Sequence, residues 1–289
     1  MNDKNLTQLD IDNYNNNIDG VNKKYEIDND YHKYLYINED NLRDQCTNIF
    51  HITKDNHLFF SSSIEKDHEV IIIIDKKCDV YVNSDIHNNG FHCVFFIHQD
   101  SKLQLLTNQR TDNLSIKFCF YLYNNAILKH LHNLKIDTHS NNLFEYHLLG
   151  DNSKCYVNNA IDLSHRSVND TQIKVFHEQS NTQSFIKCKS LLNDESDLSF
   201  DCNVIVNSNL KNIHSEQVNN NILKTPNCRI KTIPQMNIKS KDINVSHSVT
   251  IQYVDKNIVR YVQSRGMIKE VFNELLYKNY FHELSFCDR

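Results

Sequence analysis

The sequence predicts a mainly β chain that ends in a short helical region. From about residue 34, short apolar runs rich in β-branched and aromatic residues alternate with polar turns, and this composition favours strands. No long helical periodicity of 3.6 residues occurs before Asp255. Only 39% of the 289 residues are hydrophobic, and a solenoid suits such a chain because neighbouring coils share a thin core. An antiparallel sandwich would give similar runs, so the pattern alone leaves both architectures open.

The N-terminal segment, residues 1–35, is polar and rich in Asn and Asp, and we expect it to be disordered or loosely attached. It has no apolar core of the kind found in signal peptides. No segment approaches the roughly 20 apolar residues of a membrane span. Acidic and basic residues are interspersed, with a formal net charge of -5, so nucleic acid is a poor candidate partner. We therefore expect a cytoplasmic protein.

The predicted β core occupies residues 36–250. Its apolar runs are about three to seven residues long, which is the usual range for strands. The whole chain has only four glycines, which counts against tight two-residue hairpins because these depend on glycine. The clearest runs are residues 70–74, 80–82, 94–97, 103–106, 118–123, 126–128, 144–149, 173–176 and 204–206.

Two further strands are predicted at residues 232–238 and 242–250, where apolar and polar residues alternate. Pro234 cannot donate a ladder hydrogen bond, so it belongs at a strand start, an edge or a bulge. His247 follows the second alternating run and lies between two serines. This setting favours a solvent-open surface or a partner over a packed core.

The C-terminal region, residues 251–289, changes to a helical period. Asp255 can cap a helix that runs to about Ser264, and Gly266 can supply the left-handed residue that ends it. A second helix is predicted after Ile268, because apolar residues recur there at the i, i+3, i+4 and i+7 positions. We expect the two helices to cap the open core of the solenoid.

The C-terminal half resembles the SufB–SufD family of iron–sulfur cluster assembly scaffolds. The family pattern runs Gln, Asn-Leu-Leu, Pro-Gln-Leu-Glu-Ile, Asp-Asp-Val-Lys-Cys-Ser-His-Gly-Ala-Thr and Phe-Tyr-Leu-x-Ser-Arg-Gly. Matching segments occur in the same order at Gln217, 221–223, 234–238, 242–250 and 261–266. The SufD branch is closer, because the SufB pattern has Glu-His-Glu-Ala where this chain has Ser-His-Ser-Val.

This resemblance implies a right-handed parallel β-helix and a function as a non-catalytic scaffold subunit of the SUF system. Such a subunit pairs with a SufB-like subunit and docks a SufC-like ATPase through its C-terminal helical region. A homodimer is one expected state of the isolated chain. A SufB-like cluster scaffold is the close alternative. A β-helix enzyme that acts on polysaccharides is less favoured, because its paired carboxylates are missing and the acids here are scattered in turns.

The resemblance also assigns candidate site residues. His247 matches the family histidine at the SufB–SufD interface, where the nascent cluster is thought to bind, and imidazole is a plausible iron ligand. The family cysteine two residues earlier is Val245 here, which cannot bind iron, so other ligands would come from the SufB-like subunit. An interface histidine without metal is the alternative. Tyr261, Arg265 and Gly266 match the segment expected to dock the ATPase. The implied cofactor is a transient iron–sulfur cluster, and the sequence does not indicate a flavin.

Other histidines are interpreted as structural. His130 and His132 are two residues apart and would share one face of a strand, with no third metal ligand apparent nearby. His165, His177 and Asp170 suggest a catalytic group at first sight, but no activated Ser or Cys accompanies them.

The nine cysteines are odd in number and form no Cys-x-x-Cys pair. Both facts argue against a disulfide framework and against a self-contained zinc or cluster site. We expect most of the cysteines to lie in the core as small apolar residues, with Cys93 and Cys119 pointing inward.

Overall fold

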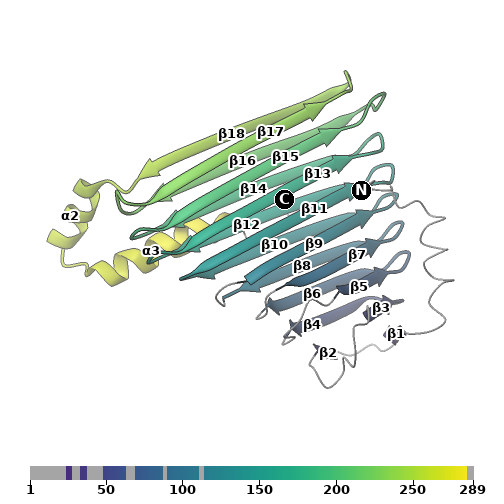
Figure 1. The fold of residues 1–289 in the computed structure, drawn as a ribbon, viewed down its shortest axis with the longest axis horizontal. Helices are drawn as coiled ribbons and strands as arrows, with labels where there is room; N and C mark the ends of the chain where they lie inside the picture. The colour runs from purple at the N-terminus through teal and green to yellow at the C-terminus, as the bar shows by residue number, and fades with distance from the viewer. Residues whose placement is uncertain are drawn as a thin grey trace.

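The computed structural model describes residues 24–27, 33–37, 48–62, 69–86, 90–110 and 114–284. The chain alternates between two parallel sheets, so that each strand pairs with the strands two places before and after it (Figure 1). Within the described ranges each sheet has nine strands. The fold is therefore a parallel β-solenoid, as predicted, and the antiparallel sandwich is excluded.

Sheet A contains β1 (Lys24–Ile27), β3 (Asn48–Ile52), β5 (Glu69–Ile74), β7 (Phe91–Ile97), β9 (Leu114–Leu122), β11 (His139–Leu148), β13 (Val168–His177), β15 (Asp197–Val206) and β17 (Arg229–Ile238). Sheet B contains β2 (Lys33–Ile37), β4 (Asn56–Ser62), β6 (Asp79–Ile86), β8 (Lys102–Gln109), β10 (Ile127–Ile136), β12 (Lys154–Leu163), β14 (Gln183–Leu192), β16 (Ile213–Leu223) and β18 (Ile243–Tyr253). The tail contains α2 (Lys256–Ser264), α3 (Lys269–Phe281) and the short 3-10 helix η2 (His282–Leu284).

Most of residues 1–35, the segment expected to be disordered, lies outside the described residues. β1 falls within this segment and β2 overlaps its end, so the described sheets begin before residue 36. The division of the chain at residues 36 and 251 stays a prediction.

The core lies between the two sheets and is filled by alternate residues of the strands from β6 to β16. In β10 and β15 buried and partly exposed residues alternate along the strand, as the period of two requires. Aromatic rings from successive coils stack inside: Phe95 on Phe120 at 4.9 Å between centroids, and Phe120 on Tyr146 at 5.0 Å. The stacked rings continue the hydrophobic contact from one coil to the next.

Left-handed corners explain how the chain turns with so few glycines. Asn and Asp tolerate the left-handed conformation better than other residues with a Cβ, and they supply most of these corners. The corners also stack: Asn125 Nδ2 donates to Asp100 Oδ1 at 2.7 Å, and Asn212 Nδ2 donates to Asn181 Oδ1 at 2.9 Å. The described non-glycine residues with positive φ are Lys77, Asp100, Asn125, Asn152, His165, Asn181, Asp194, Asn209 and Asn212.

Seven cysteines lie in the described residues, and all are buried: Cys78, Cys93, Cys119, Cys155, Cys188, Cys202 and Cys228. Cys93 faces the core, as predicted. The predicted inward direction of Cys119 is wrong, because Phe118 and Phe120 take the inward positions of β9. Cys119 instead joins a smaller apolar cluster with Val94 and Phe96 on the outer face of sheet A. Cys46 and Cys287 lie outside the described residues.

The tail helices do not cap the solenoid, so that prediction is wrong. α3 runs back along the outer face of sheet B (Figure 1). Lys189 Nζ donates to the Tyr280 carbonyl and to Glu283 Oε2, both at 2.8 Å, and Tyr280 Oη donates to the Asn220 carbonyl at 2.7 Å. The physical reason is that Leu191, an apolar residue on the outer face of β14, is buried there. Neither α2 nor α3, nor any other helix within the described ranges, is long and apolar enough to cross a membrane.

Candidate functional site

The end of the solenoid formed by β17 and β18 is open. β17 is the last strand of sheet A and β18 the last strand of sheet B. Residues of β18 that continue inward-facing columns are exposed: Val249 by 36%, Ile251 by 47% and Tyr253 by 63%. Pro234 lies in β17, so its edge position is confirmed. An unpaired edge beside exposed apolar residues is a natural site for association with another chain.

His247 lies on β18 and faces the inner side of the open end. It pairs with Gln217 of β16, which is only 4% exposed. Paired residues of neighbouring parallel strands point to the same face, so His247 continues an inward column. It is nevertheless exposed, because β18 ends sheet B. The exposure was predicted from the flanking serines, but the inward direction was not.

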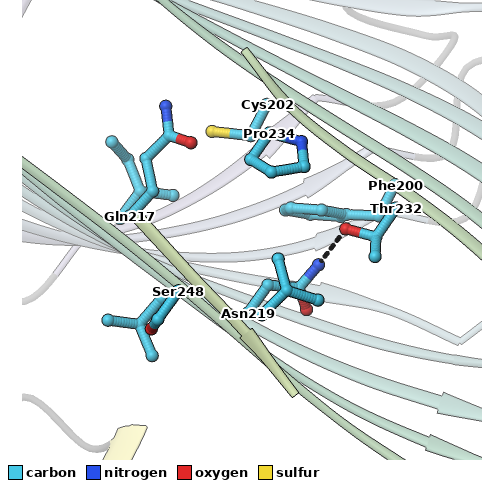
Figure 2. A pocket seen from close by; sticks show the side chains of 10 residues that line it. Phe200, Cys202, Gln217, Asn219, Thr232, Pro234 and Ser248 are labelled. Atoms are coloured by element: carbon cyan, nitrogen blue, oxygen red, sulfur yellow. Dashed lines mark hydrogen bonds between the residues drawn. The ribbon is translucent and has the colours of Figure 1, made fainter. Parts of the chain in front are cut away.

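A pocket of about 240 Å³, open to solvent, lies between the last coils. Gln217 and Asn219 enter it from β16, while Cys202 and Pro234 enter it from the opposite sheet (Figure 2). Burial raises the pKa of the Cys202 thiol, so this thiol is neutral at pH 7. The full lining is Ile186, Phe200, Cys202, Gln217, Val218, Asn219, Thr232, Pro234, Ser248 and Val249.

Two amide side chains in this pocket keep buried oxygens without a hydrogen-bond partner, namely Gln217 Oε1 and Asn219 Oδ1. Asn219 Nδ2 donates to Thr232 Oγ1 at 2.6 Å (Figure 2), and Gln217 Nε2 donates to the Gln235 carbonyl at 3.4 Å. A buried acceptor without a partner costs about 1–3 kcal/mol, so these two oxygens mark a place where another group belongs. The sequence placed Gln217 in a matching segment but gave no sign that it is buried beside His247.

The residues predicted to dock the ATPase lie together at the end of α2. The guanidinium of Arg265 lies 5.4 Å from the centroid of the Tyr261 ring, and Tyr261 is 60% exposed. Gly266 has a φ of 87°, so it ends the helix in the left-handed region as predicted. Asp255 caps the start of α2 by accepting from the Asn257 backbone N–H at 2.8 Å, also as predicted.

Exposed apolar side chains surround this helix end. They come from α2 and from α3, and they leave an apolar surface on the tail that nothing within the described ranges covers. They are Ile258, Tyr261, Ile268, Val271 and Leu275.

His130 and His132 share the inner face of β10, as predicted, and both are fully buried. His130 hydrogen bonds with Tyr146 Oη at 2.8 Å, and His132 lies 3.2 Å from both Asn159 Oδ1 and Gln109 Oε1. Burial lowers the pKa of His130 and lowers that of His132 to about 4. The pair therefore belongs to a neutral hydrogen-bond network inside the core.

The structure does not bring His165, His177 and Asp170 together. His177 is buried and hydrogen bonds with Thr182 Oγ1 at 2.7 Å and Ser184 Oγ at 2.9 Å. His165 lies in an exposed corner with a φ of 57°, and Asp170 lies on the outer face of β13. Among the described residues, no three His, Cys, Asp or Glu side chains gather as a set of metal ligands.

The described chain is thus a parallel β-solenoid with an open end and a helical tail. A family model described as "SUF system FeS cluster assembly, SufBD core domain" matches residues 58–280. The match covers more than half of the chain, so the chain belongs to the SufBD core family of SUF iron–sulfur cluster assembly. The predicted resemblance is confirmed.

Two curated relatives agree with this family. An iron–sulfur cluster assembly SufBD family protein of Synechocystis sp. is 28% identical over 107 residues, which cover 36% of this chain and 23% of the relative. The iron–sulfur cluster assembly protein SufD of Escherichia coli is 24% identical over 138 residues, which cover 48% of this chain and 33% of the relative. The alignments thus span a third or less of each relative.

Proposed function

We propose that this chain is a SufD-like, non-catalytic scaffold subunit that pairs with a SufB-like subunit through the open end of its solenoid. The observation that carries the proposal is the exposed, inward-facing column of β18, which includes His247, Val249 and Ile251. A homologous solenoid placed against this end would cover the apolar side chains and continue the sheets beyond their unpaired edges.

In this proposal a nascent iron–sulfur cluster is the cargo, and His247 contributes one ligand through a ring nitrogen. Val245 lies two residues earlier in the same inward direction and offers no ligand atom, so the remaining ligands come from the SufB-like subunit. His247 is exposed, so its ring is accessible to groups from the partner.

The tail would dock a SufC-like ATPase through Tyr261, Arg265 and Gly266. A planar guanidinium stacked on an exposed aromatic ring suits a protein interface, and the exposed apolar residues of α2 and α3 would supply buried contact area. Motion of the ATPase would reach the solenoid through α3, which is hydrogen bonded to the outer face of sheet B.

The test is a complex coexpressed with a SufB-like subunit and a SufC-like ATPase, in wild-type form and with His247→Ala. Because His247 is exposed, the substitution should change the free energy of unfolding by no more than about 0.5 kcal/mol. Anaerobic cluster formation, followed by visible absorption, should be lost, and Val245→Cys should partly restore it because thiolate is a good ligand for iron–sulfur chemistry.

Normal cluster formation by a stably folded His247→Ala complex would contradict the ligand role. Size exclusion of the same preparations tests the pairing separately. A chain that elutes alone, or only as a homodimer, in the presence of the SufB-like subunit would contradict the scaffold proposal.

A further inference from the structure

Gln217 carries a buried acceptor in the same inward column as His247. The two residues are paired across β16 and β18, and neighbouring strands lie about 4.8 Å apart. The Nε2 group of Gln217 faces the Gln235 carbonyl at 3.4 Å. A backbone carbonyl can only accept, so this contact fixes the orientation of the amide. Its Oε1 atom is left as a buried acceptor without a partner.

Across β18, only the unpartnered oxygen of Gln217 is paired with a residue that carries an N–H donor, while on β14 Asn219 is paired with Cys188, whose thiol is a weak donor. Asn219 is paired with Val249, which has no polar side-chain atom. His247 is an imidazole, and in its neutral form one ring nitrogen donates while the other accepts. Ile186, the neighbour of Gln217 on β14, offers no donor either. The column therefore contains one matched donor and acceptor.

We propose that Gln217 is a positioning residue for His247. Its Oε1 accepts the N–H of one ring nitrogen, so the other nitrogen keeps its lone pair and faces outward from the open end. Histidines that bind metals commonly donate their second ring N–H to an oxygen, which fixes the tautomer and the ring orientation. The outward nitrogen is the one that would bind iron. The role of the Gln217–His247 hydrogen bond in cluster assembly therefore rests on the proposed function, whereas the existence of the hydrogen bond does not depend on it.

The first test measures the tautomer of His247 in the isolated full chain. Long-range ¹H–¹⁵N correlation spectra at pH 8 report which ring nitrogen carries the proton, and a His247→Ala spectrum assigns the signal. Removing the acceptor with Gln217→Leu should change the tautomer ratio by about two- to tenfold, the factor expected for one hydrogen bond of ordinary net strength. Gln217→Glu keeps an acceptor and should keep the wild-type tautomer.

Asn219→Leu is the matched control, because it removes the other unpartnered oxygen of the same pocket, while Val249, the residue paired with Asn219 on β18, has no donor. It should leave the His247 signal unchanged. Equal tautomer ratios in folded wild-type and Gln217→Leu chains would overturn the inference. If Gln217→Leu fails to fold, Gln217→Glu becomes the test. A His247 tautomer ratio in Gln217→Glu that differs from the ratios of both the wild type and Asn219→Leu would then overturn the inference.

The second test measures cluster yield in the coexpressed complex. Gln217→Leu should lower the cluster yield several-fold, whereas Gln217→Glu, which keeps an acceptor, should give about the wild-type yield. If His247→Ala assembles clusters normally while Gln217→Leu still shifts the tautomer ratio, the proposed function fails and the contact stands. If the tautomer ratio is insensitive to Gln217 while His247→Ala abolishes assembly, the proposed function stands and the positioning role fails.

Discussion

The buried histidines illustrate how single residues tie the stability of the solenoid to pH. His132 and His177 lie inside the core, and burial lowers the pKa of each to about 4. An unfolded histidine has a pKa of about 6.5. Between these values the unfolded chain binds more protons than the folded chain, so stability falls as the pH drops from about 6.5 to about 4.

Urea unfolding at pH 7 and pH 5 tests this dependence. Each of these histidines should contribute a loss of about 2 kcal/mol on going to pH 5. His132→Gln retains hydrogen-bonding groups beside Gln109 and Asn159 but removes the titrating ring. The difference between the two pH values should therefore shrink by about 2 kcal/mol relative to wild type. An unchanged difference in this variant would show that His132 is not the neutral, buried group described above.

The pairing of His130 and His132 on one face followed from their spacing, but their partners did not. Tyr146 is 16 residues from His130 along the chain, while Asn159 and Gln109 are 27 and 23 residues from His132. All three partners lie on other strands, and only the register of the coils brings them into contact. The pairing of Gln217 with His247 was likewise not predictable from their positions in the sequence, because it depends on the register of β18 with β16.

At the scale of the elements, the carboxylate of Glu283 in η2 is one of the groups that hold the end of the tail on sheet B. Glu283 accepts from Lys189 at 2.8 Å and from Lys187 at 3.1 Å, and these two lysines lower the pKa of Glu283 to about 2. The side chain of Lys189 is only 6% exposed, whereas that of Glu283 is 60% exposed. Solvent screening on the Glu283 side keeps the contribution of this pair small.

Glu283→Gln should therefore loosen the end of α3 without unfolding the solenoid. Amide hydrogen exchange at residues 277–281 should accelerate by up to about fivefold, the factor that corresponds to about 1 kcal/mol. Glu274→Gln is the control, since Glu274 pairs within α3 with Lys278 at 2.7 Å. Equal exchange in the two variants would rule out a holding role for Glu283.

The end of α2 gives a prediction for binding. Arg265→Glu reverses the charge beside Tyr261 and places a negative side chain at the C-terminus of a helix. Like charges across an interface can cost several kcal/mol, so affinity for the SufC-like ATPase should fall by about tenfold or more, measured by calorimetry with the purified complex.

Lys211→Glu is the matched charge reversal for this experiment. Lys211 is exposed in the corner before β16, at the end of the strands opposite to α2. It should leave ATPase affinity unchanged. If Arg265→Glu binds as tightly as Lys211→Glu and both are folded, Arg265 is not at the contact.

The helices show what local sequence determines and what it does not. Asp255, Ser264 and Gly266 defined both ends of α2 correctly, because capping and the left-handed terminal residue act within one turn. The location of α3 was predicted wrongly, because the outer face of sheet B on which it lies is assembled from separate coils. Leu191 becomes part of that face only through the register of β14 with its neighbours.

On the scale of the whole molecule, the family resemblance implied a solenoid, but the sequence did not show how long each coil would be. The coils change in length: Asn48 pairs with Val70 in one coil, and Asp197 pairs with Arg229 in another. Corners absorb these differences while the strands keep their alignment. A repeat of fixed length was therefore absent from the sequence, although each strand could be located from its own composition.

The open end predicts how the molecule associates. A double substitution of Val249 and Ile251 by Lys places two charges on the exposed inner face of β18. Surface changes of this kind should alter the free energy of unfolding only slightly, whereas pairing with the SufB-like subunit, or with a second copy, should be lost in size exclusion and mass measurement. Val168→Lys is the control, since Val168 is 42% exposed at the start of β13. Retained pairing in the folded double variant would place the interface elsewhere.

The pairing of each coil with only its predecessor and successor has a consequence for biosynthesis. A chain leaves the ribosome at about 5–20 residues per second, N-terminus first, so a coil of about 30 residues emerges roughly every 1.5–6 seconds. Each finished coil offers its free edge as the template on which the next one pairs. The most recently formed coil therefore carries the unpaired strand edges, which make it the part of the nascent protein most prone to association. Among the described residues, the coil that carries His247 is the last to form, and no later strand pairs with it.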